Sequence, residues 1–125
     1  MKVILLTTLL LFSVNGFAFN WKLIGENSIG SSFYVDVDSI KKFDGLVYYW
    51  ELSDWIEPSD GVFSYTKKYK VNCGEEKQTQ LSLTTYSQQM GKGRTVHEIT
   101  PNQIKFPKPN TLEYAVMKFA CKNAR

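Results

Sequence analysis

The 125-residue sequence is poor in the residue types that most often carry chemistry. It has one histidine and two cysteines, and it lacks a G-x-S-x-G motif that would select one serine as a nucleophile. It also lacks a strong basic excess, since its formal net charge is +3, whereas nucleic-acid-binding domains usually carry clustered basic charge. We therefore expect no enzymatic activity, no cofactor and no nucleic-acid partner.

Long apolar runs are absent except at the N-terminus. Lys2 is followed by an uncharged segment, residues 3–14, and by small residues up to Ala18. A positive start, a short apolar core and small residues before a cleavage point are typical of a secretory signal peptide. The run is shorter than the ~20 residues of a membrane-spanning helix, and no cysteine follows it to accept a lipid. We predict a signal peptide over 1–18 and one domain over 19–125, exported to the periplasm or the cell surface.

The two cysteines, Cys73 and Cys121, both lie in the predicted exported part. In an oxidising compartment the simple expectation is one disulfide between them. Closing a loop of this length would restrict the unfolded chain by on the order of 4 kcal/mol. The disulfide would leave no cysteine for catalysis or for a metal.

Most of the exported part consists of short runs that alternate apolar and polar residues and are separated by turn residues. This pattern predicts an antiparallel sheet of about six strands. The most strongly predicted strand, residues 46–52, has two rows. The apolar row is Leu46, Tyr48, Trp50 and Leu52, and the row opposite is Val47, Tyr49 and Glu51. The proline-rich segment 100–109 is expected to be a loop or an edge passage.

The period changes to helical from Asn110 onward. Asn110 or Thr111 can cap a helix, Glu113 suits its first turn, and Lys118 and Lys122 lie near its end. Most other side chains of this segment are apolar, so the helix should be largely buried. The expected fold class is α+β, with a single antiparallel sheet and a C-terminal helix packed on one face and tied by the disulfide.

The stretch FYVDVDSIKKFDG, residues 33–45, gathers three carboxylates. It fails as an EF-hand loop, because Ile40 and Lys41 would occupy the fifth and sixth positions of a loop that begins at Asp36. Asp36 and Asp38 would lie roughly 7 Å apart on one face of a strand, a spacing that paired catalytic carboxylates also use. We favour a structural interpretation, with metal binding or hydrolysis as alternatives.

In the structural interpretation of this stretch, Asp38 and Ser39 cap a short turn of helix. Ile40 then enters the core, and Asp44-Gly45 forms a hairpin turn.

Candidate binding residues are aromatic or basic. Trp55 lies just before a predicted turn, where an aromatic side chain can serve an interface. Lys67, Lys68 and Lys70 alternate with tyrosines on one strand, a pattern also typical of a solvated sheet face or a protected edge. His97 is interpreted as a strand residue rather than a ligand. The candidate partner-binding residues are thus Trp55, Lys67, Lys68, Lys70, Lys92 and Arg94, the last two in a glycine-rich hairpin.

Several segments in order resemble the bacterial surface-adhesin protein E family. They are Trp21, FYVDVDSI at 33–40, VYYWELSDW at 47–55, SYTKKYKVNC at 64–73, LTTYSQQMGKG at 83–93 and a cysteine in the final helix. The resemblance implies a small antiparallel sheet with a disulfide-held C-terminal helix, here through Cys73 and Cys121, and a structural role for the D-x-D-S-I element. It further implies attachment to host matrix or plasma proteins.

The function we expect is therefore that of an exported, non-enzymatic binding protein with a protein partner in the matrix or the envelope. The alternative is a periplasmic envelope protein that holds a small apolar ligand between helix and sheet.

Overall fold

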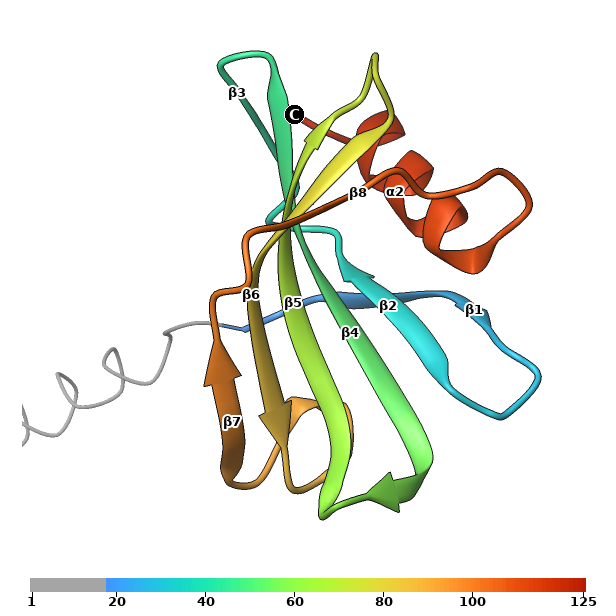
Figure 1. Cartoon of the computed structure of the whole chain (residues 1–125), viewed down its shortest axis with the longest axis vertical. Helices are drawn as coiled ribbons and strands as arrows, with labels where there is room; N and C mark the ends of the chain where they lie inside the picture. The colour runs from blue at the N-terminus through green and yellow to red at the C-terminus, as the bar shows by residue number, and fades with distance from the viewer. Residues whose placement is uncertain (1–17) are drawn as a thin grey trace, which may run out of the picture.

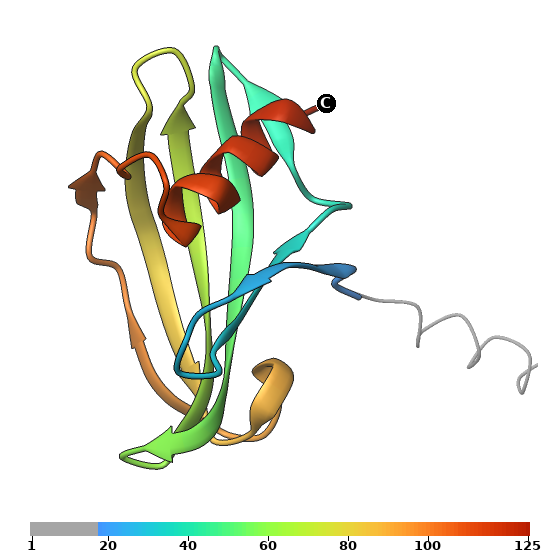
Figure 2. The same ribbon diagram turned by 90° about the vertical axis from the view of Figure 1, so that its right-hand side faces the viewer.

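The computed structural model describes residues 18–125, shown in two views (Figures 1 and 2). The signal peptide predicted over 1–18 lies, apart from Ala18, outside the described residues. The described chain forms one curved antiparallel sheet and one C-terminal helix (Figure 1). The predicted α+β class, with one helix on one face of the sheet, is confirmed.

The sheet has eight strands in the described part of the chain, in the order β1-β2-β4-β5-β6-β7, with β3 paired to β4 and β8 paired to β6. About six strands were expected; β3 and β8 raise the number and have three residues each. The strands are β1 (Trp21–Glu26), β2 (Ser32–Asp36), β3 (Lys41–Phe43), β4 (Leu46–Ser59), β5 (Val62–Asn72), β6 (Lys77–Tyr86), β7 (Thr95–Ile99) and β8 (Gln103–Lys105).

The core lies between the helix and one face of the sheet, which we call the helix face. Alternation places Val47 and Tyr49 of β4 on this face beside their partners Val71 and Tyr69 of β5. All four side chains are at most 3% exposed. The opposite face, here called the open face, carries Tyr48 and Trp50 opposite Lys70 and Lys68. Each core side chain of this size contributes about 1.5–3 kcal/mol on burial.

Helix α2 (Leu112–Lys122) begins at Thr111, whose Oγ1 accepts a hydrogen bond of 3.1 Å from the Tyr114 amide. Its inner side consists of Val116, Met117 and Ala120, all fully buried against the sheet. The helix crosses only the upper part of the helix face and leaves the lower part uncovered (Figure 2). This uncovered part is where the candidate site lies.

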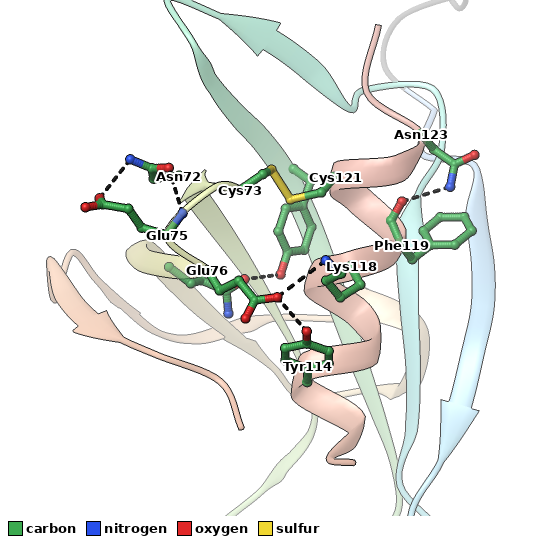
Figure 3. Close-up of a disulfide and its surroundings, with 11 residues drawn as sticks. Asn72, Cys73, Glu75, Glu76, Tyr114, Lys118, Phe119, Cys121 and Asn123 are labelled. Carbon is green, nitrogen blue, oxygen red and sulfur yellow. Dashed lines mark hydrogen bonds and ion pairs between the residues drawn. A yellow bond between two sulfur atoms is a disulfide. The ribbon is translucent and has the colours of Figure 1, made fainter. Parts of the chain in front are cut away.

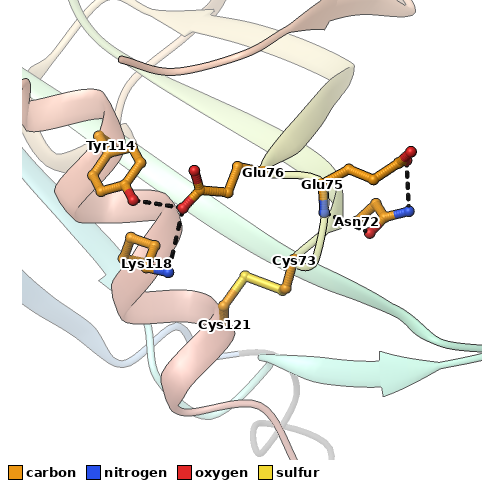
Figure 4. A network of polar contacts seen from close by, with 7 residues as sticks. All are labelled: Asn72, Cys73, Glu75, Glu76, Tyr114, Lys118 and Cys121. Atoms are coloured by element: carbon orange, nitrogen blue, oxygen red, sulfur yellow. Dashed lines mark hydrogen bonds and ion pairs between the residues drawn. A yellow bond between two sulfur atoms is a disulfide. The ribbon is translucent and has the colours of Figure 1, made fainter. Parts of the chain in front are cut away.

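The disulfide joins Cys73, directly after β5, to Cys121 in the last turn of α2, with the two Cα atoms 6.0 Å apart (Figure 3). A second tether lies beside it. Glu76 accepts a hydrogen bond from the Tyr114 hydroxyl and forms an ion pair of 3.4 Å with Lys118 (Figure 4). The Tyr114 hydrogen bond holds the pKa of Glu76 below its usual value. Covalent and polar links therefore fasten the same side of the helix to the β5–β6 turn.

The stretch 33–45 is structural, with two corrections to its expected details. Residues after β2 form a turn without a helix, and the capping carboxylate is Asp36 rather than Asp38. Asp36 can cap because it ends β2 in a buried position, 3% exposed, where its side-chain oxygens accept hydrogen bonds from the Asp38 amide and the Ser39 hydroxyl. Ile40 enters the core, as expected.

Strand β4 has 14 residues and continues well beyond the expected end at Leu52. It turns at Asp60 and Gly61, which have φ values of 50° and 78°. A two-residue loop with positive φ at both positions matches the twist of a hairpin. Residues 55–58 lie in a register shift between the β4–β5 pairs Asp54–Ser64 and Ser59–Val62. They therefore project from the sheet as an arm.

Candidate functional site

An open hollow lies on the helix face beside the β4 arm, and we call it the Trp55 hollow. Its volume is about 620 Å³, within the ~300–1,000 Å³ range of ligand pockets. It is lined by the β1–β2 loop, by β2, and by the ends of β4 and β5. The lining residues are Asn27, Ile29, Ser31, Phe33, Ser53, Trp55, Ile56, Glu57, Ser59 and Tyr65.

The β1–β2 loop is shaped by Asn27 and Gly30. Asn27 Oδ1 accepts hydrogen bonds from the amides of Ile29 at 3.1 Å and Ser31 at 2.9 Å. Gly30 has a φ of 87°, and a Cβ atom there would lie 2.8 Å from Ile56 Cδ1. Glycine is needed both for this backbone conformation and for the close approach. The loop thereby meets the β4 arm and forms one wall of the hollow.

Trp55 is half-buried and held in place on three sides. Its Nε1 donates a hydrogen bond of 3.1 Å to Ser53 Oγ, and its ring meets Tyr65 edge to face at 5.7 Å. Its carbonyl oxygen accepts a hydrogen bond of 3.0 Å from Gln89 Nε2. A fixed aromatic ring contacts a partner without the entropy cost of ordering a mobile side chain.

Two aliphatic side chains make the rim of the hollow apolar. Ile29 is 81% exposed and Ile56 is 69% exposed. Both line the hollow together with Trp55. A cluster of exposed apolar side chains around an aromatic is typical of an interaction site.

Two charged residues, Glu51 and Lys67, lie on the same face between the hollow and the helix. They are cross-strand partners, and Lys67 Nζ lies 4.6 Å from the centre of the Tyr65 ring. Burial raises the pKa of Glu51 to about 7, although the positive charge of Lys67 opposes this shift. Burial also lowers the pKa of Lys67. The inner end of the hollow is therefore bordered by a carboxyl group that titrates near neutral pH.

The six candidate residues from the sequence do not form one site. Trp55 and Lys67 both contact Tyr65 on the helix face. Lys68 and Lys70 lie on the open face, where Lys68 Nζ is 5.6 Å from the centre of the Trp50 ring.

Lys92 and Arg94 are exposed in the segment after the short helix η2 (Gln89–Gly91). This segment is anchored on the lower sheet, because Met90 donates its amide hydrogen to Asp54 Oδ1 and Gly91 donates to Ser64 Oγ. The anchoring buries Leu52 beneath it, at 0% exposure.

The residues that the sequence offered for catalysis or metal binding are either hydrogen-bonded within the fold, as Asp36 is, or exposed, as His97 is. Asp36 Oδ1 accepts hydrogen bonds from the Asn20 amide at 2.8 Å and the Asp38 amide at 3.3 Å, and Oδ2 accepts one from Ser39 Oγ at 2.6 Å. His97 is exposed on the edge strand β7. Within residues 18–125, no three His, Cys, Asp or Glu side chains are grouped as metal ligands. No helix in that range is long and apolar enough to cross a membrane.

Sequence reasoning found Trp55 but missed its neighbours Ile29, Phe33, Ile56 and Tyr65. Ile29 lies in a polar loop and Ile56 next to a predicted turn, so neither belongs to an apolar row. Gly30 was the available signal, since glycine is favoured where the backbone needs a positive φ or where two segments approach closely. The local sequence pattern does not indicate that the segment approached by Gly30 is the one that contains Ile56.

The fold and the hollow define a class of small α+β domains in which a disulfide-tethered C-terminal helix covers part of one antiparallel sheet. Within this class, the chain belongs to the surface-adhesin protein E family, whose family model matches residues 21–122. No curated protein sequence matches the chain.

The fold is similar to solved structures of protein E from Haemophilus influenzae. Crystal form II has a TM-score of 0.62 and 18% identity, with 86% of this chain and 91% of that chain covered. The selenomethionine form has a TM-score of 0.61 and 17% identity, with 87% and 91% covered. A third structure has a TM-score of 0.60 and 17% identity, with 86% and 88% covered. At this identity the likeness concerns the fold.

Proposed function

We propose that this chain is an exported, non-enzymatic binding protein of the adhesin type that contacts a protein partner through the Trp55 hollow. Residues 1–18 direct export and are removed, which leaves the domain 19–125. Membership of the surface-adhesin protein E family supports this function. The observation that carries the proposal is the fixed Trp55 ring, which lines one hollow together with the exposed side chains of Ile29 and Ile56.

A protein partner fits this surface because the rim is open and apolar while the base offers polar atoms. An apolar side chain of the partner can enter between Trp55 and Phe33, and the hydroxyl groups of Ser53 and Ser59 lie at the same hollow. Interfaces commonly place an aromatic anchor at the centre and polar groups around it. Host matrix and plasma proteins are the partner class that the family suggests.

The test measures binding of the purified exported protein to immobilised matrix and plasma proteins. Ile56→Ser changes the rim at a side chain that is 69% exposed and should leave the fold intact. We expect it to weaken binding about tenfold, and Trp55→Ala more strongly, as for interface hot spots. Phe43→Ser is the matched control, because Phe43 is also 69% exposed but lies at the β3–β4 turn.

Equal binding by wild type, Ile56→Ser and Trp55→Ala would contradict a contact through this hollow. Cell fractionation tests the adhesin role itself. An adhesin must be accessible from outside the cell, so recovery only from the periplasmic fraction would count against that role.

A small apolar ligand in the same hollow is the second candidate function, favoured by its volume of about 620 Å³. The ligand position first expected, between helix and sheet, is filled by side chains such as Tyr49 and Met117, which are at most 1% exposed. Native mass spectrometry of the protein purified from its own host would detect a retained ligand. Detection of the bare protein alone would remove this candidate.

A further inference from the structure

A second hollow lies on the open face of the sheet, and we call it the lysine hollow. Its volume is about 400 Å³, and it lies where β4, β5, β6 and the turn before β8 meet. Its lining combines two lysines, three other polar side chains and two aliphatic ones. These residues are Lys70, Lys77, Asn72, Thr79, Asn102, Leu46 and Ile104.

The strand register explains why these side chains gather there. Lys70 is paired with Thr79, and Asn72 is paired with Lys77, so all four point to the open face. Ile104 of β8 is also paired with Thr79. The lysine hollow is therefore separate from the Trp55 hollow, which lies on the helix face.

The lysine hollow is positively charged and its charge is not neutralised. Within residues 18–125 the one ion pair joins Lys118 to Glu76, so neither Lys70 nor Lys77 has a carboxylate partner. The lining itself contains no acidic residue. The adjoining turn has two acidic residues, and both have other partners. Glu75 accepts a hydrogen bond of 2.8 Å from Asn72 Nδ2, and Glu76 pairs with Lys118 and Tyr114. An anionic group between the two lysines would therefore be stabilised.

The remaining groups of the hollow match a sugar ring rather than an anion alone. The Thr79 hydroxyl can donate or accept a hydrogen bond, and the Asn102 amide can do both, as the hydroxyl groups of a sugar require. Leu46 and Ile104 provide apolar contacts for the C–H groups of a ring. The volume of about 400 Å³ accommodates one or two sugar units.

The open face continues beyond the hollow with groups of the same two kinds. Tyr48 is paired with Lys70, and Trp50 is paired with Lys68, whose Nζ lies 5.6 Å from the Trp50 ring centre. Phe19 meets Trp50 edge to face at 6.0 Å and is 49% exposed. Aromatic rings alternating with lysines would extend contact along a chain of acidic sugars.

We propose that the lysine hollow binds an acidic sugar unit of an anionic polysaccharide, with the sugar carboxylate between Lys70 and Lys77. The ring rests on Leu46 and Ile104, and the chain continues along Lys68 and Trp50. This site does not depend on the function proposed for the Trp55 hollow, because the two lie on opposite faces of the sheet.

The test measures dissociation constants of the exported protein for defined oligosaccharides by calorimetry. The probes are octasaccharides of hyaluronan and heparin, which represent host glycans, and of alginate, which represents bacterial polyuronates. A neutral dextran oligosaccharide is the negative probe. We expect Lys70→Gln and Lys77→Gln each to weaken binding of the acidic probe that binds best by about fivefold or more, as for a lost charge-assisted hydrogen bond.

Two control variants make the test specific. Lys122→Gln removes the same charge from an exposed position at the end of α2, and Trp55→Ala changes the other hollow. Both should bind within about twofold of wild type, since neither residue lies on the open face. Thermal unfolding of each lysine variant checks that the fold is intact.

Three results would overturn the proposal. They are the absence of binding to every acidic probe, an equal loss of affinity in Lys122→Gln, or tighter binding of a single-stranded DNA octamer with the same sensitivity to Lys70 and Lys77. The last result would assign the hollow to nucleic acid instead.

Discussion

Glu51 on β4 and Lys67 on β5 lie opposite each other on the helix face, at the border between the covered core and the Trp55 hollow. Lys67 is half-buried and Glu51 is 4% exposed. Burial raises the pKa of Glu51 from 4.5 to about 7, against the opposing charge of Lys67. The negative charge of Glu113 raises the pKa of Glu51 further, and the positive charge of Lys105 lowers it. The protonation of Glu51, beside the Trp55 hollow, therefore affects the stability of the fold.

The first prediction concerns the pH dependence of stability. Because the pKa of Glu51 is higher in the folded state, its contribution to stability is fully present below pH 4.5 and is lost as the pH rises through about 7. Glu51→Gln removes this loss. We expect the variant to gain up to about 3 kcal/mol relative to wild type between pH 4.5 and 7.5.

Urea unfolding at several pH values measures this difference. Glu57→Gln is the matched control, because Glu57 lies on the same strand but is exposed. A constant difference in the free energy of unfolding between wild type and Glu51→Gln across this range would show that Glu51 does not titrate as stated.

The second prediction concerns the disulfide. Replacing Cys73 and Cys121 together by alanine should lower the free energy of unfolding by about 4 kcal/mol or less and the melting temperature by on the order of 15 °C. The helix should remain in place, because Val116, Met117 and Ala120 are fully buried and Glu76 still bonds Tyr114 and Lys118 (Figures 3 and 4).

Calorimetry gives the melting temperature, and far-UV circular dichroism at low temperature reports the helix. Loss of the helical signal in the folded variant would mean that the disulfide, rather than the apolar interface, holds α2 on the sheet.

The third prediction separates the two aspartates of the D-x-D motif. Asp36 accepts three hydrogen bonds from the N-terminal segment and the following turn, whereas Asp38 is exposed. Asp36→Ala removes the acceptor of three part-buried hydrogen bonds and should cost about 2–4 kcal/mol. Asp38→Ala should change stability by no more than about 0.5 kcal/mol. Chemical unfolding of both variants tests this, and equal losses would contradict the structural role of Asp36.

Much of the fold was predictable because it follows from local periodicity and composition. The alternation of residues 46–52 and 62–73 identified the two central strands, the change of period after Asn110 identified the helix, and two cysteines allowed one disulfide. Strand β4 is nevertheless longer than the alternation predicts, because Pro58, Ser59 and Asp60 resemble a turn. The turn itself uses only Asp60 and Gly61.

The sites were less predictable, because each combines residues from segments that are distant in the sequence. Trp55 was identified by its own chemistry, but its hollow requires the contact of Gly30 with Ile56. Alternation along β5 already places Lys67 on one face and Lys68 and Lys70 on the other, but it does not show which other segments join them. Lys77, Thr79 and Asn102 join Lys70 only because β6 and β8 pair beside β5.

The sequence by itself determined which side chains share a face, since alternation along an extended chain is a property of the backbone. Only the tertiary structure decided which face is covered. Local hydrophobicity favours the apolar row of Leu46, Tyr48, Trp50 and Leu52, but the helix covers the opposite row. The helix lies on the row of Val47 and Tyr49, which contains Glu51, because Tyr69 and Val71 complete the apolar surface and Cys73 follows on the same side. Burial of that row is a collective property of β4, β5 and α2.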